Sequence, residues 1–175
     1  MSFVLEFPRI RDVETLFKGD AFSVAVDQTM ATQGWQGGQF VRWVDSPRDE
    51  FLVSFSDGLY GGFLLWGSNE SSDQFISMTG NQPLYRFCTL CAGGWLMATR
   101  TYEKYTWASR QFGPLVSIVY TPGSRLRISL RGWLTSEDEW TLSGDPRAPN
   151  TYYIGSIIQA PSADNNFYIT VQTSI

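Results

Sequence analysis

The sequence predicts an all-β fold, a single-domain β-sandwich or barrel with long loops and little helix. Three observations predict it. Apolar and polar residues alternate with a period of two along most of the chain. Turns rich in Gly, Pro, Asn and Asp separate the alternating runs. No stretch of twelve or more residues has the 3.6-residue period of an amphipathic helix. Short strands with regular turns indicate roughly 10–12 strands in one domain over 1–175.

The expected elements follow the chain in order. Asp12 is expected to cap a short helical turn through Phe17, which Gly19 ends. Glu103–Gln111 fits either a helix or an extended segment, whereas 143–150 is expected to be a long loop within the domain. Strands are expected over residues 22–26, 39–44, 51–56, 62–66, 74–78, 84–90, 95–100, 115–120, 125–131, 152–159 and 167–172.

Composition narrows the class of function. The chain has no histidine, two cysteines and 13 basic residues, of which two are lysine, but it has seven tryptophans. Histidine is the commonest acid–base group near neutral pH, so no serine has its usual activating base and no catalytic residue is assigned. The net charge of −4 argues against nucleic acid as a partner, because such binders carry a basic surface.

Other observations set further expectations. The start of the chain lacks a basic, apolar leader and no apolar run could span a bilayer, so we expect synthesis in a cytoplasm and no membrane partner. Cys88 and Cys91 have no second cysteine pair to complete a zinc site, so neither a metal nor a cofactor is expected, and both thiols are expected within a strand. The carboxylates of 137–139 could suggest calcium or acid–base chemistry, but their adjacency favours a solvated acidic loop.

Arginine and tryptophan supply the candidate contact residues. On a strand over 125–131, Arg125, Arg127 and Arg131 would share one face and form a basic stripe. The stripe would dock an acidic partner, or it would be a solvated strand face paired with nearby acids. Trp35, Trp133 and Trp140 fall in expected loops, where they would stack on sugars, contact other subunits, or lie partly buried at the loop bases.

The C-terminal part of the chain, 115–175, carries a resemblance. Its segments Tyr120–Leu126, Arg131–Thr135 and Ile154–Asp164 resemble the closing β module of structural proteins from tailed-bacteriophage virions, especially capsid decoration (cement) proteins. The first 110 residues show no such likeness, and the chain is longer and richer in tryptophan than small decoration proteins.

The resemblance implies a non-enzymatic virion subunit that is made in the host cytoplasm. It implies a homo-oligomer, a trimer or a dimer, that docks on the major capsid protein or other virion subunits and stabilises the shell. The extra length also leaves a tail, connector or fibre role open. The alternative hypothesis is a carbohydrate- or receptor-binding β-domain of a tail or fibre, based on Trp35, Trp133 and Trp140.

Overall fold

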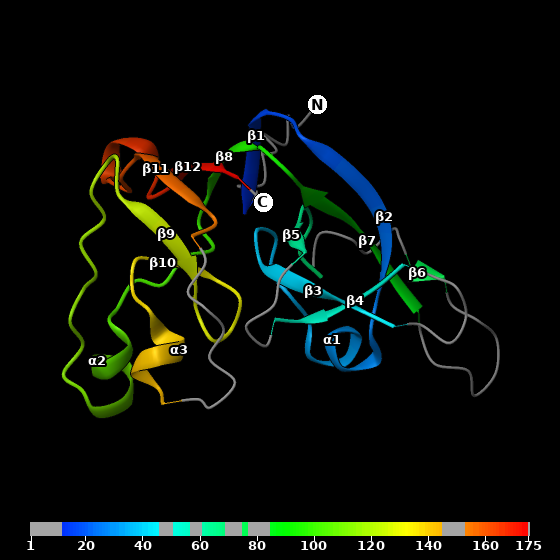
Figure 1. The fold of residues 1–175 in the computed structure, drawn as a ribbon, viewed down its shortest axis with the longest axis horizontal. Helices are drawn as coiled ribbons and strands as arrows, with labels where there is room; N and C mark the ends of the chain where they lie inside the picture. Colours follow the sequence, from blue (N-terminus) through cyan, green and yellow to red (C-terminus); the bar gives the residue numbers. More distant parts are fainter. Residues whose placement is uncertain are drawn as a thin grey trace, which may run out of the picture.

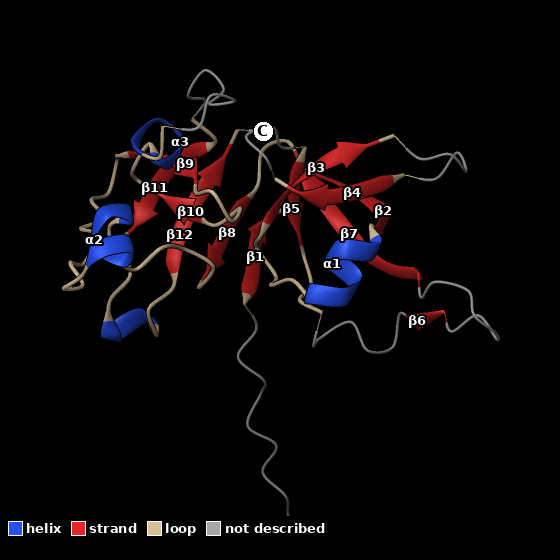
Figure 2. Cartoon of the chain, turned by 90° about the horizontal axis from the view of Figure 1, so that it is seen from below, coloured by secondary structure: helices blue, strands red, loops and turns tan. Residues whose placement is uncertain are grey.

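The fold was analysed in a computed structural model, which describes residues 12–45, 51–56, 61–68, 75–76, 85–144 and 153–174. Two β-sheets lie side by side, with three short helices at their margins (Figures 1 and 2). The predicted all-β class with little helix is therefore confirmed. One sheet is open and the other closes into a small barrel, so of the two expected architectures the barrel is present in part of the chain.

The open sheet has the strand order β1-β8-β12-β11-β9-β10, and each neighbouring pair is antiparallel. Its strands come from both ends and the middle of the sequence: β1 (Val13–Phe17), β8 (Leu96–Thr99), β9 (Arg125–Ile128), β10 (Leu134–Thr135), β11 (Gly155–Gln159) and β12 (Ile169–Thr173).

The second sheet closes on itself, because β2 pairs with β4 on one side and with β7 on the other. The ring contains β2 (Asp20–Val26), β4 (Leu52–Phe55), β3 (Phe40–Val44), β5 (Gly62–Leu64) and β7 (Tyr85–Ala92). The two-residue strand β6 (Phe75–Ile76) pairs with β7 outside the ring. Because the ring is closed, each of its five strands has a neighbouring strand on both sides.

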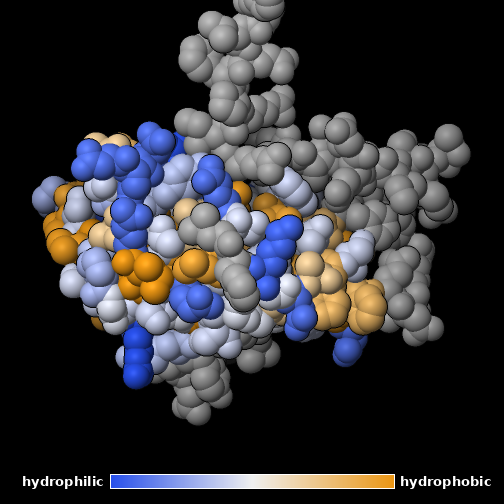
Figure 3. Space-filling view, turned by 90° about the horizontal axis from the view of Figure 1, so that it is seen from above, coloured by the Kyte–Doolittle hydropathy of each residue, from blue (hydrophilic) through white to orange (hydrophobic). Residues whose placement is uncertain are grey.

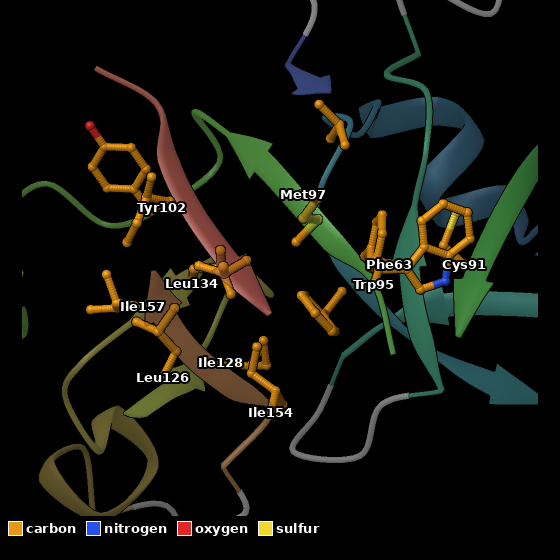
Figure 4. Packing of buried hydrophobic residues seen from close by; sticks show 14 of the residues in the cluster. Phe63, Cys91, Trp95, Met97, Tyr102, Leu126, Ile128, Leu134, Ile154 and Ile157 are labelled. Carbon is orange, nitrogen blue, oxygen red and sulfur yellow. The ribbon is translucent and has the colours of Figure 1, made fainter. Parts of the chain in front are cut away.

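One apolar core joins the barrel to the open sheet. Phe40, Phe63 and Cys91 of the barrel belong to the same buried cluster as Met97 and Leu126 of the open sheet (Figure 4). Trp95 lies at the junction, where its Nε1 donates hydrogen bonds to the carbonyls of Ala92 (2.9 Å) and Asp20 (3.2 Å). A second cluster, which includes Met30, Val53 and Leu90, fills the barrel itself.

The helices are short and capped by side chains. Asp27 caps α1 (Gln28–Gln33), Thr106 caps α2 (Trp107–Phe112) and Asp138 caps α3 (Glu139–Leu142). A 3-10 turn, η2 (Ala163–Asn165), precedes β12. Each cap accepts a hydrogen bond from a backbone N–H that has no partner inside the helix.

Several expected elements differ from those observed. The helical turn expected at 12–17 is wrong: these residues form β1, whose pairing with β8 satisfies their backbone groups. The segment Glu103–Gln111, which was open between two structures, is extended up to Thr106 and helical from Trp107. The strand expected at 115–120 is reduced to an isolated bridge between Ser117 and Tyr105. Of the expected strand at 74–78 only β6 is described, and 145–150 lie outside the described residues.

Candidate functional site

The three arginines of the expected stripe do not share one strand face. The strand β9 ends at Ile128, and the next residues turn back, with the Gly132 N–H donating to the Ser129 carbonyl. Arg125 is exposed, and its guanidinium lies 5.0 Å from the ring centre of Tyr153. Arg127 stacks on the same ring at 4.3 Å and lies 3.4 Å from Asp138. Its charge is therefore partly neutralised within the chain.

Arg131 lies in the turn after β9 and is engaged inside the chain. Its Nε and Nη2 donate to the two carboxylate oxygens of Glu103, each at 2.7 Å. Its guanidinium also lies 3.6 Å from the ring centre of Trp133. The three arginines therefore do not form the expected stripe on one strand face, because a turn replaces the second half of the strand. The alternative, pairing with nearby acids, holds for Arg127 with Asp138 and for Arg131 with Glu103.

Two of the three candidate tryptophans are buried. Trp35 is 5% exposed, and its Nε1 donates a 2.7 Å hydrogen bond to the Trp66 carbonyl. Trp140 is buried in α3. Trp133 is half-buried beneath Arg131. The sequence placed all three in loops, but the loops fold back onto the sheets. Trp35 and Trp140 therefore do not offer their rings to a sugar or to another subunit.

A cluster of buried charges connects the two helices of this end of the molecule. Glu103 and Glu139 are both fully buried. Arg110 of α2 bridges them, with Nη1 3.4 Å from Glu103 and Nη2 bonded to Glu139. Burial raises the pKa of Glu139, while the Leu130 N–H and Arg110 oppose that rise. We call Glu103, Arg110, Arg131 and Glu139 the charged cluster.

The solvated loop expected at 137–139 is therefore wrong for Glu139, which faces inward. Its neighbours are also used within the chain. Glu137 accepts a 2.8 Å hydrogen bond from the Trp107 N–H, and Asp138 caps α3. All three carboxylates thus contribute to local structure, and none of them lines the cavity described below.

An exposed apolar segment follows α2. Its side chains Phe112, Leu115, Val116 and Val119 all lie in solvent, and Phe112 and Val119 are each 83% exposed. We call residues 112–119 the apolar loop. Two backbone hydrogen bonds of 2.9 Å hold it beside the preceding extended segment, from Thr106 N–H to the Val116 carbonyl and from Ile118 N–H to the Lys104 carbonyl. Apolar side chains also appear on the surface at the end that carries the open sheet (Figure 3, left).

A cavity of about 520 Å³ opens beside the apolar loop. Its walls include the aromatic rings of Tyr102, Tyr105, Tyr120 and Phe167, and two cations, Arg100 and Lys104. Ser117 and Ile118 belong both to the cavity wall and to the apolar loop. The volume lies in the range of pockets that bind small groups, which are mainly apolar with a few polar contacts. The apolar loop and this cavity together form the candidate site.

Three of the polar side chains in the cavity wall, those of Arg100, Tyr102 and Tyr120, are bonded inside the chain. The Tyr102 hydroxyl donates to the Phe167 carbonyl at 2.8 Å, and the Tyr120 hydroxyl donates to the Glu103 carbonyl at 2.6 Å. Burial, with the charge of Glu103, raises the pKa of Tyr120, so its hydroxyl stays protonated at neutral pH. Arg100 donates through Nε and Nη2 to the Asn166 carbonyl.

Lys104 differs from these groups. Its side chain is exposed and, over the part of the chain that the structure describes, its ammonium forms no hydrogen bond or ion pair. Neither Lys104 nor the apolar loop was identified from the sequence, because 115–120 has the alternation of an ordinary strand. The available signal was the run Phe112–Val116, which contains three large apolar residues and breaks the period of two at Gly113 and Pro114.

The thiols lie in β7, as predicted, and both are free and buried. Burial raises the pKa of Cys88, and it raises that of Cys91 to about 12. Among the described residues, no three side chains of the His, Cys, Asp or Glu type gather as a metal site would require. In the same part of the chain, no helix has both the length and the apolar character needed to cross a membrane.

Comparison with known proteins adds no assignment: no family model, no curated protein and no solved structure matches the chain.

Proposed function

We propose that this protein is a non-enzymatic structural subunit of a bacteriophage virion, of the capsid decoration (cement) kind. In this role it docks as a dimer or trimer on the major capsid protein or on other virion subunits. The resemblance of 115–175 supports the virion assignment. The observation that carries docking is the apolar loop, whose four large side chains face solvent although backbone hydrogen bonds fix the segment.

Apolar surface in water costs about 25 cal/mol per Å² relative to a covered state. Contiguous exposed apolar residues on a folded chain are typical of interaction surfaces. Phe112, Leu115, Val116 and Val119 all lie within residues 112–119, and a partner that covers them recovers this energy.

The test uses purified particles from infected host cells. We expect the chain at a fixed copy number per particle, in a simple ratio to the major capsid protein. Particles assembled with the double variant Leu115→Ser/Val119→Ser should lose the chain on gradient purification. The matched control is Phe51→Ser, which removes an exposed apolar side chain from the barrel. Intact particles that lack the wild-type chain would overturn the proposal.

A further inference from the structure

The cavity beside the apolar loop has a definite chemical preference. Its walls are aromatic, and the residues that line it within the described ranges include two cations and no acid. Arg100 is committed to the Asn166 carbonyl and lies 5.1 Å from the ring centre of Tyr168. Lys104 is therefore the positive group left for a ligand, and a complementary ligand places one negative charge beside an apolar group.

The hydrogen-bonding groups of the cavity wall also disfavour a sugar as the ligand. A sugar ring needs several hydrogen-bond partners, but the hydroxyls of Tyr102 and Tyr120 already donate to backbone carbonyls. Tyr105 and Ser117 remain as neutral polar side chains in the wall. A largely apolar group with a single anionic neighbour matches this supply better than a polyol does.

The rim indicates the source of that group. Ser117 and Ile118 connect the cavity with Leu115, Val116 and Val119 of the apolar loop, and Phe167, which is 56% exposed, also lines the cavity. A pocket with an extended apolar rim is typical of protein–protein contacts, where one large side chain enters the pocket and neighbouring contacts exclude water.

We propose that this cavity receives an aromatic or branched aliphatic side chain of a partner protein, and that Lys104 binds an Asp or Glu carboxylate next to that side chain in the partner's sequence. This inference rests on the proposed function, since it names the chemistry of the surface on which the subunit docks. The partner side chain that enters the cavity supplies most of the affinity. Lys104 adds selectivity, because it favours partner segments in which that side chain has an acidic neighbour.

The composition of the chain permits a sharp binding test. Its two lysines, Lys18 and Lys104, are both exposed. Reductive methylation with ¹³C therefore gives one NMR signal from Lys104 at the cavity and one from Lys18 as an internal control, besides that of the α-amino group, which the Lys18→Gln and Lys104→Gln variants distinguish from both. The probe is the blocked peptide acetyl-Gly-Phe-Asp-Gly-amide. The comparison peptides carry Asn or Lys in place of Asp.

We expect the Asp peptide to shift the Lys104 signal in a saturable way and to leave the Lys18 signal unchanged. The Asn peptide should bind about three-fold more weakly, as expected for loss of one solvent-exposed ion pair, and the Lys peptide more weakly still. Lys104→Gln, followed through backbone amide signals, should bind the Asp and Asn peptides equally. Lys18→Gln should retain the discrimination.

Three outcomes would overturn the proposal: no saturable shift at Lys104, equal binding of the three peptides to the wild-type chain, or tighter binding of free phenylacetate than of the Asp peptide. The last result would assign the cavity to a small carboxylate. If particle association survives while peptide binding fails, the cavity proposal is wrong and the proposed function stands. If peptides bind but intact particles lack the chain, the proposed function is wrong.

Discussion

Arg131 is the position where the sequence and the structure make opposite predictions. As a member of an exposed docking stripe, it could be removed without cost to folding. In the structure it binds both oxygens of Glu103 at 2.7 Å, and Glu103 is fully buried. Arg131→Ala therefore leaves a buried carboxylate with Arg110, at 3.4 Å, as its remaining basic partner.

The expected loss of stability depends on how deeply each member of the Glu103–Arg131 pair is buried. Removing one partner of a buried ion pair costs about 3–5 kcal/mol. The Arg131 side chain is 51% exposed, so solvent screens part of the interaction. We therefore expect a loss of about 2 kcal/mol in the free energy of unfolding. For a chain of this size, that loss lowers Tm by roughly 4–8 °C.

The assay is reversible denaturant unfolding, with calorimetry for Tm. Arg125→Ala is the matched control, because Arg125 is exposed on β9 and forms no ion pair within the described residues. It should unfold like the wild type. The double variant Glu103→Gln/Arg131→Ala should lose less stability than Arg131→Ala, since the buried carboxylate that has lost its closer basic partner is then neutral. Equal stability of Arg131→Ala and Arg125→Ala would refute the reasoning.

Three further predictions follow from the described contacts. Burial raises the pKa of the Glu139 carboxyl above its ordinary value of 4.5, so the folded chain binds the carboxyl proton more tightly than the unfolded chain does. The stability of the wild type relative to Glu139→Gln should therefore fall as pH rises above 4.5. A difference in stability that stays constant between pH 4 and 8 in urea melts would contradict this. Since burial raises the pKa of Cys91 to about 12, iodoacetamide at pH 8 should leave both thiols unmodified until the chain is denatured, which intact-mass spectrometry measures. Trp35→Phe should lower stability by about 1–2 kcal/mol in chemical denaturation, because it leaves the Trp66 carbonyl without the 2.7 Å indole donor; stability unchanged within error would show that the hydrogen bond contributes nothing.

The sequence predicted the all-β class and most strand positions because alternation is a local property. Val24 and Val26 are buried, as their spacing requires. Closure of the barrel was not predictable in the same way. It depends on pairing β2 with β7, from Asp20↔Ala92 to Val26↔Arg86, and those partners lie far apart in the sequence. Alternation indicates which face of a strand is buried but not which strand is its neighbour.

The exposure of individual side chains was not predictable for a related reason. Trp35 lies in a Gly-rich loop, which left exposure and partial burial both open; it is buried, and the loop is held by Ser68, whose N–H donates to the Trp35 carbonyl at 2.9 Å. Glu139 belongs to a run of acids, which predicted solvation, but its partner Arg110 is 29 residues away. A local pattern gives the type of a side chain and its setting in the sequence. Whether that side chain is exposed depends on distant partners, which the pattern does not contain.

The charged cluster and the candidate site are linked through α2. Arg110 binds both buried glutamates, and its Nε donates a 3.1 Å hydrogen bond to the carbonyl of Tyr105, a residue of the cavity wall. Buried ion pairs are commonly no more stabilising than apolar residues of the same volume. The particular effect of this cluster is therefore on position: it holds the start of α2 and the 103–106 segment, to which the apolar loop is hydrogen-bonded. The apolar loop is built on an isolated bridge rather than on a regular strand, so the proposed docking would need such a support to present its apolar side chains in one arrangement.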